Sequence, residues 1–253
     1  MGDISRRALM RQAGPIFSSV VLAGPAHPQS TGDARAKTGK LKLLVAGGHP
    51  GDPEYGCGGT VARYTEQGHA VTLLYLNRGE GGIPGKSGKE AAGIRSAEAA
   101  KACELLKAKP LFADQIDGQS IVDKAHYDTF ARLIEGERPG VLFTQWPIDG
   151  HPDHRATSML CYEAWLRMGK SFGFYYYEVS DGEDTLMFSP AEYVDITATE
   201  ARKHAACYAH ASQSPDRFYA LQEQVARFRG VESGVGQAEA FVRHVQSRGG
   251  MLP

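Results

Sequence analysis

Runs of apolar residues predict the strands of a buried sheet. Residues 41–46, 70–76 and 141–145 are apolar with little alternation of polar positions, and each run ends at a loop of glycine and polar residues. A strand that is buried on both faces has this pattern, which is typical of parallel sheets. Shorter strands are predicted over residues 110–113, 173–179 and 193–196.

Apolar residues at helical spacing predict helices between and after these strands. The predicted helices cover residues 55–67, 89–107, 123–135, 154–168, 199–212 and 216–230. Gly68, Gly136 and Pro139 provide stop signals after the early ones. Because strand and helix alternate repeatedly, the pattern predicts an α/β fold with a doubly wound, mostly parallel sheet and helices on both faces.

Two polar loops follow predicted strands and carry the candidate chemistry. After residue 46 the chain reads GGHPGD, so that a bend at Pro50 and Gly51 separates His49 from Asp52. After residue 145 it reads WPIDGHPDHR, which contains His151 and His154. Side chains at the carboxyl ends of parallel strands meet at one edge of the sheet, and two histidines with a carboxylate are a ligand set of hydrolytic zinc sites.

Both loops also have a purely structural interpretation. Asp52 and Asp153 each precede or begin a predicted helix, where a carboxylate commonly caps the helix N-terminus. Capping and metal ligation are compatible with one another. The Gly56-x-Gly58-Gly59 run lacks the spacing of dinucleotide and phosphate loops, which disfavours a nucleotide-binding regulator.

Composition limits the classes of partner. The chain has 253 residues, 42% of them hydrophobic, and a net charge of −1. This length can bury one substantial core, and the near-zero charge disfavours nucleic acid and anionic membranes as partners. No apolar run approaches the roughly 20 residues of a membrane span. Four widely spaced cysteines lie among apolar neighbours in predicted helices and are expected to be buried thiols: Cys57, Cys103, Cys161 and Cys207.

The first 40 residues differ in character from the rest of the chain. Ser5, Arg6 and Arg7 precede an apolar segment at residues 16–23, which resembles a twin-arginine export signal. We therefore expect residues 1–40 to be an export signal and linker, residues 41–253 to form a single domain, and the protein to be periplasmic or extracellular. The alternative is a disordered cytoplasmic extension with a chance arginine pair.

The two loops together resemble the PIG-L/LmbE family of zinc-dependent N-acetylglucosamine-type deacetylases. The resemblance rests on GGHPGDPE after the first strand and GHPDHR after a later one, and it extends to Arg78-Gly-Glu80 and Asp117-Gly118. His210-Ala-Ser-Gln213 and Ala238-Glu-Ala-Phe241 are also similar. The family resemblance implies a Rossmann-like fold.

The resemblance also implies roles for individual residues. By position, His49, Asp52 and His154 would bind the metal, His151 would polarise or protonate the reacting amide, and Asp153 would orient His151. The family's general-base aspartate falls on Gly51, so another carboxylate is needed. Asp149 is the first candidate because it shares a loop with His151 and His154, and Glu54 and Glu80 follow. Apart from the resemblance, Arg78, Glu80 and Trp146 are the expected sugar contacts, with a place in the hydrophobic core as the alternative for Trp146.

The sequence thus predicts a zinc-dependent hydrolase that removes an acetyl group from an N-acetylglucosamine-type sugar. Another divalent metal in place of zinc is the alternative for the cofactor. The alternative is a metal-binding carbohydrate-binding pseudoenzyme, because losing a general base costs roughly 10²–10⁴-fold in rate. The expected partner is a small amino-sugar substrate.

Overall fold

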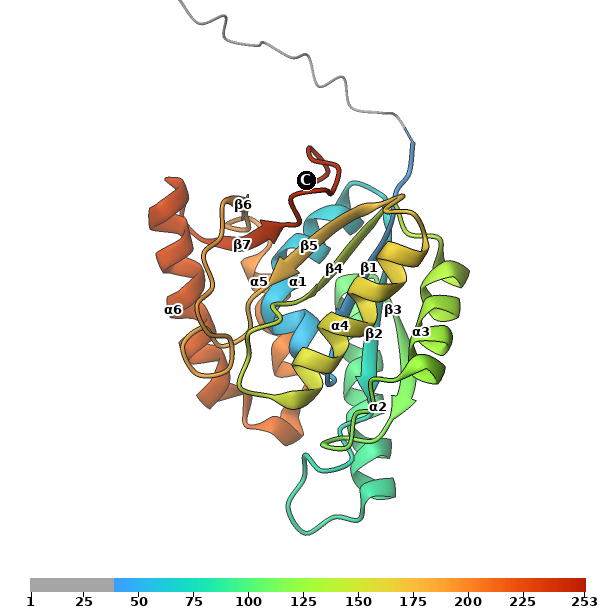
Figure 1. Ribbon diagram of the computed structural model, residues 1–253. Helices are drawn as coiled ribbons and strands as arrows, with labels where there is room; N and C mark the ends of the chain where they lie inside the picture. Colours follow the sequence, from blue (N-terminus) through green and yellow to red (C-terminus); the bar gives the residue numbers. More distant parts are fainter. Residues whose placement is uncertain (1–38) are drawn as a thin grey trace, which may run out of the picture. The chain divides into compact units, whose positions relative to one another are not determined.

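Strand β1, Lys42–Gly47, lies inside a seven-stranded sheet in the computed structural model, which describes residues 39–253 (Figure 1). The other strands are β2 Ala70–Asn77, β3 Lys109–Gln115, β4 Val141–Gln145, β5 Gly173–Tyr177, β6 Glu192–Asp195 and β7 Ala238–Arg243. Their order across the sheet is β3-β2-β1-β4-β5-β7-β6. Neighbouring strands from β3 to β5 are parallel, whereas β7 is antiparallel to both β5 and β6.

Helices cover both faces of this sheet. They are α1 Asp52–Glu66, α2 Gly88–Leu106, α3 Lys124–Glu137, α4 Pro152–Arg167, α5 Glu200–Tyr208 and α6 Pro215–Ser233, with a short 3-10 turn η1 at Ala211–Gln213. Leu43 and Val45 of β1 belong to the core under α1, α2, α5 and α6, whereas Leu44 and Ala46 belong to the core under α3 and α4. The doubly wound α/β prediction is confirmed.

The sequence prediction differs from the structure at strand β7. No strand was predicted over Ala238–Arg243, yet β7 lies between β5 and β6 and pairs with both. The Glu239 side chain interrupts its apolar pattern, and this carboxylate is buried against Lys203. Met159 of α4 and Phe228 of α6 lie at the apolar spacing of their helices, yet both side chains are exposed.

The strand order places the two polar loops side by side. β1 pairs with β2 on one side and β4 on the other, so the chain direction across the sheet reverses at β1. A crevice forms at such a point, outside the carboxyl ends of the strands. Because Ala46 of β1 is in register with Thr144 of β4, the loops that follow these two strands leave the sheet together.

Three features bear on the remaining predictions. The four cysteines are free and buried, one each in α1, α2, α4 and α5, as predicted. Within residues 39–253, no helix combines the length and apolar character needed to cross a membrane. Residues 1–38, where the export signal is predicted, lie outside the described residues, so that signal stays a prediction.

Candidate active site

The first loop holds its imidazole and carboxylate against one another. Gly51, at a φ of 113°, turns the chain from β1 into α1, and its carbonyl accepts the first helical hydrogen bond, from Tyr55. Asp52 begins α1, and its Oδ2 accepts a hydrogen bond from the His49 backbone N–H at 2.8 Å. The same oxygen lies 3.3 Å from His49 Nδ1.

The second loop brings His154 to the same carboxylate oxygen. His154 lies in the first turn of α4, and its Nε2 is 3.2 Å from Asp52 Oδ2. Gln145, the last residue of β4, donates from Nε2 to that oxygen at 3.1 Å and accepts from the Gly48 N–H at 2.8 Å. The structure therefore brings together the three predicted metal ligands, His49, Asp52 and His154.

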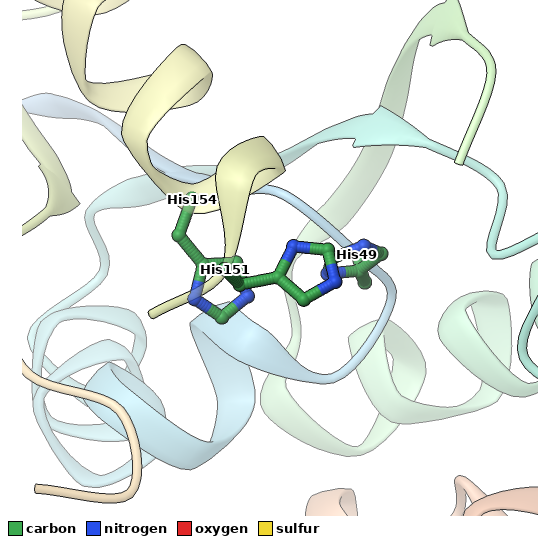
Figure 2. A group of neighbouring side chains, drawn as sticks. All are labelled: His49, His151 and His154. Carbon is green, nitrogen blue, oxygen red and sulfur yellow. The ribbon is translucent and has the colours of Figure 1, made fainter. Parts of the chain in front are cut away.

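His151 completes a group of three imidazoles (Figure 2). Its ring centroid is 4.5 Å from that of His49 and 4.9 Å from that of His154. One ring nitrogen of each of these histidines lies within 4.8 Å of the other two. The His151 Nδ1 accepts a hydrogen bond from the Asp153 N–H at 3.2 Å, so the neutral ring carries its proton on Nε2.

Each of the two imidazoles predicted as metal ligands has a carboxylate beside its other nitrogen. His154 Nδ1 lies 3.0 Å from Asp149 Oδ1, and His49 Nε2 lies 3.1 Å from both Asp117 Oδ1 and Asp153 Oδ2. Carboxylates in this position orient metal-binding histidines and fix their tautomer. A buried group of histidine and aspartate side chains that could hold a metal ion is thus present, and His49, His151 and His154 each offer it a ring nitrogen.

Two predicted catalytic carboxylates have contacts that differ from those expected. Asp149 is buried, its Oδ1 accepts from the His151 N–H at 2.8 Å, and its Oδ2 accepts from Thr185 Oγ1 at 3.1 Å. The Asp153 carboxylate contacts His49 and accepts from Ser120 Oγ at 2.6 Å. The hydrogen bond between Asp153 and His151 comes from the Asp153 backbone N–H, because the His151 side chain caps α4.

The clustered charges shift the protonation of these groups. Burial would raise the pKa of Asp52, but the neighbouring His154 and His49 outweigh it and hold that pKa well below its usual value. Burial would lower the pKa of His154, but Asp52 and Asp149 raise it to about 9. For His151, burial and then the positive charges of His49 and His154 lower the pKa. His151 is thus neutral near pH 7.

A cavity of about 520 Å³ opens over this cluster. Besides the histidines and Asp52, its walls include Tyr55, Arg95, Asp184, Gln213 and Phe218. The volume lies within the range of small-molecule sites, roughly 300–1,000 Å³.

Among residues 39–253, the side chains that line the cavity do not include the three expected sugar contacts. Arg78 packs on the Phe112 ring and pairs with Asp114, and Trp146 donates to the Leu186 carbonyl. Glu80 accepts from the backbone N–H groups of Arg78 and Asp117, which shapes the loop after β2. Their sugar contacts stay a prediction.

Sequence reasoning missed three polar residues of the cavity wall. Arg95 and Gln213 lie on or near helices whose apolar spacing gave no sign of a cavity, although Gln213 belongs to a segment with family resemblance. Asp184 lies in the polar excursion after β5, which has no periodic pattern.

Comparisons with known proteins find deacetylases and a hydratase among similar chains. The family model PIG-L, described as GlcNAc-PI de-N-acetylase, matches residues 44–165. The diacetylchitobiose deacetylase of Thermococcus kodakarensis is 30% identical, covering 79% of this chain and 82% of that protein. The 4-oxalmesaconate hydratase of Pseudomonas putida is 27% identical, covering 82% and 87%. The solved diacetylchitobiose deacetylase of Pyrococcus horikoshii is 26% identical with a TM-score of 0.72, covering 81% of this chain and 84% of that one.

Proposed function

This chain belongs to the PIG-L family of de-N-acetylases, and on that premise we propose that it is a zinc-dependent hydrolase that removes the acetyl group from an N-acetylglucosamine-type sugar or conjugate. The observation that carries the proposal is the convergence of His49, Asp52 and His154 at the floor of the cavity. Two histidines, which would bind zinc in their neutral form after losing a proton, and a carboxylate are a ligand set of catalytic zinc sites, in which a further position is held by water.

The first requirement of amide hydrolysis is a cation held at the reacting bond. His49 and His154 each present one nitrogen toward Asp52, while carboxylates hold their other nitrogens. A bound divalent cation supplies Lewis acidity toward water and the amide carbonyl. Asp149, which fits poorly as a base because both its oxygens are engaged, instead orients His154.

The second requirement is a hydrogen-bond donor for the oxygen that becomes negative during attack. His151 lines the cavity, its Nδ1 accepts from the backbone, and its Nε2–H is therefore the donor. Such a preorganised donor stabilises charge that develops only in the transition state, typically by about 3–4 kcal/mol.

The walls of the cavity suit a polar ring substrate. Arg95 provides a hydrogen-bond donor group, and Gln213 provides its Oε1 as an acceptor because its Nε2 donates to Gly82 and Ser212. Tyr55 and Phe218 provide aromatic surface. Relatives of this chain include deacetylases of diacetylchitobiose, an amino-sugar disaccharide. We therefore propose amino sugars of one or two rings as the substrate class.

Acetate release tests the proposal. The full chain is loaded with zinc and given N,N'-diacetylchitobiose or N-acetylglucosamine, and acetate is measured before chelation, after chelation and after zinc is restored. We expect release that a chelator abolishes and zinc restores. Binding of sugar and zinc without acetate release would favour the pseudoenzyme, and release unaffected by metal removal would contradict the proposed site.

A further inference from the structure

We propose that Asp184 is the catalytic base of this site and that it takes the place of the carboxylate missing at Gly51. This inference rests on the proposed hydrolase function. The loop after β5 contributes the Asp184 carboxylate to the cavity wall.

The backbone at Gly51 does not favour a carboxylate at that position. Its φ of 113° and ψ of −39° belong to a region that residues with a side chain rarely adopt. A Cβ built there would be only in ordinary contact with Tyr55 and His210, so the backbone conformation, rather than lack of space, disfavours aspartate. The base must therefore come from another element.

Three carboxylates line the cavity within the described chain: Asp52, Asp117 and Asp184. Asp52 contacts both ligand imidazoles, and Asp117 contacts His49 through Oδ1 and the Gly81 N–H through Oδ2. The Asp184 side chain forms no hydrogen bond with another residue of 39–253 and is partly open to the cavity. It is therefore the carboxylate with both oxygens available to accept a proton.

The other proposed substitutes are occupied. Glu54 is fully buried, and its Oε1 accepts from Tyr75 and contacts His210. Glu80 holds two backbone N–H groups of the loop after β2. Neither glutamate is among the residues of 39–253 that line the cavity.

The fold holds Asp184 beside the second metal-binding loop. Residues 184–186 run antiparallel to residues 148–150, with Gly150 N–H donating to the Asp184 carbonyl at 2.8 Å and Leu186 N–H donating to the Ile148 carbonyl at 3.0 Å. Side chains alternate along such a ladder. The Thr185 hydroxyl bonds Asp149 behind His154, and the Asp184 side chain lies in the cavity wall.

A second anchor fixes the start of this loop. Glu178 and Arg229 form a buried two-pronged pair, with 2.7 Å from Nε to Oε1 and 2.7 Å from Nη2 to Oε2. This pair ties the chain after β5 to α6. The Ser180 N–H also donates to Gln222 of α6 at 3.2 Å. Asp184 therefore has a defined position, which a base requires.

The hydrogen bonding of His151 determines how the proton must move. Because the Asp153 N–H occupies Nδ1, His151 can donate a hydrogen bond from Nε2 but has no spare proton to release. The water oxygen bonds to the amide carbon while one water proton passes to an Asp184 oxygen. Asp184 then gives that proton to the nitrogen as the C–N bond breaks and its electron pair leaves with the amine. The products are acetic acid and the free amine, and Asp184 is ionised again.

Substitution of Asp184 tests this assignment. Zinc-loaded Asp184→Asn and Asp184→Ala are compared with Glu183→Gln, which alters an exposed carboxylate on the same turn. The readouts are kcat and KM for N,N'-diacetylchitobiose, turnover of p-nitrophenyl acetate and bound zinc. We expect both Asp184 variants to lose about 10²–10⁴-fold in kcat with zinc content and KM little changed. Added formate should restore part of the rate to Asp184→Ala, and Glu183→Gln should match the unaltered protein.

The two substrates separate this inference from the proposed function. The protein could hydrolyse the ester but release no acetate from any sugar. If a chelator and the Asp184 substitutions each abolished that ester turnover, the result would support Asp184 as the base and reject the sugar substrate. Asp184→Asn with kcat within about threefold of the unaltered protein would overturn the assignment, as would loss of zinc from that variant. A protein that hydrolyses neither substrate would overturn both proposals.

Discussion

The surroundings of Asp184 change the pKa of its carboxyl group in a direction that suits a catalytic base. Burial, only partly opposed by His154 and reinforced by Asp52 and Asp149, raises the pKa of Asp184 from 3.8 to about 6. Glu183 also raises the pKa of Asp184. A base with a pKa just below the working pH is ionised yet still accepts a proton readily.

This pKa sets the direction of a pH dependence. The base must be ionised, so kcat/KM should fall tenfold per pH unit below about 6 and level off above it. Rates of acetate release between pH 4.5 and 8, with bound zinc measured at each pH, check this. Glu183→Gln should keep the same acidic limb, and the residual activity of Asp184→Asn should lack it. A limb that persists in Asp184→Asn would assign it to another group.

The same shift affects folding. A carboxyl whose folded pKa lies above its unfolded value favours folding at low pH, and this contribution is lost as pH rises from about 4 to about 6. Asp184→Asn should therefore melt at a higher temperature than the unaltered protein at pH 7, with the difference disappearing near pH 4. Cost in stability at a catalytic position is a common trade-off.

At this scale the meeting of three side chains was easier to predict from the sequence than the composition of the cavity wall. His49, Asp52 and His154 follow strands and occur in motifs, so their meeting was predictable. The direction of the Asp153 side chain was not predictable. Only the fold reveals that its carboxylate turns toward His49 and not toward His151. Asp184 had no motif and no period, and its relevance arises from pairing between residues 148–150 and 184–186.

Among the elements, α1 depends on a charge pair contributed by two distant segments. Lys203 of α5 lies 2.7 Å from Glu239 of β7, and both side chains are almost fully buried. The Glu239 carboxylate also accepts from the N–H groups of Gly59 and Thr60 of α1, at 2.9 and 2.7 Å. One carboxylate thus joins α1, α5 and β7 behind the candidate site.

Lys203→Met should be strongly destabilising because it leaves Glu239 buried without its cation. We expect a loss of about 3–5 kcal/mol in the free energy of unfolding, measured by urea denaturation. Lys101→Met removes an exposed ion pair with Glu104 on α2 and should cost less than about 1 kcal/mol. Equal effects for the two variants would show that the buried pair contributes little.

Pattern reasoning predicted most elements but not their full arrangement. Parallel strands with apolar runs and amphipathic helices were evident, and their bounds were close to those of the structure. Strand β7 was missed because Glu239 and Arg243 break its apolar pattern, and a buried Lys–Glu pair between α5 and β7 cannot be inferred from spacing along the chain. Tertiary contacts determine such polar positions.

For the whole domain, metal binding should couple to stability. A cation bound only by the folded state at 100 times its dissociation constant stabilises by about 2.7 kcal/mol. For a chain of this size, that amounts to a melting temperature about 5–10 °C higher, measured by calorimetry with zinc or with chelator. His154→Ala should abolish the zinc-dependent increase, and His126→Ala, on α3 away from the cavity lining, should retain it. An increase that survives in His154→Ala would place the stabilising metal elsewhere.

The four buried cysteine thiols allow the rate of unfolding to be measured by chemical modification. Cys57, Cys103, Cys161 and Cys207 are inaccessible in the native molecule, and burial raises the pKa of Cys103 and Cys161 to about 12. An alkylating reagent such as iodoacetamide needs an exposed thiolate. Mass shifts of the intact chain should therefore progress at the rate at which molecules open, and simultaneous modification of all four sites would indicate that the layers on both faces of the sheet come apart together.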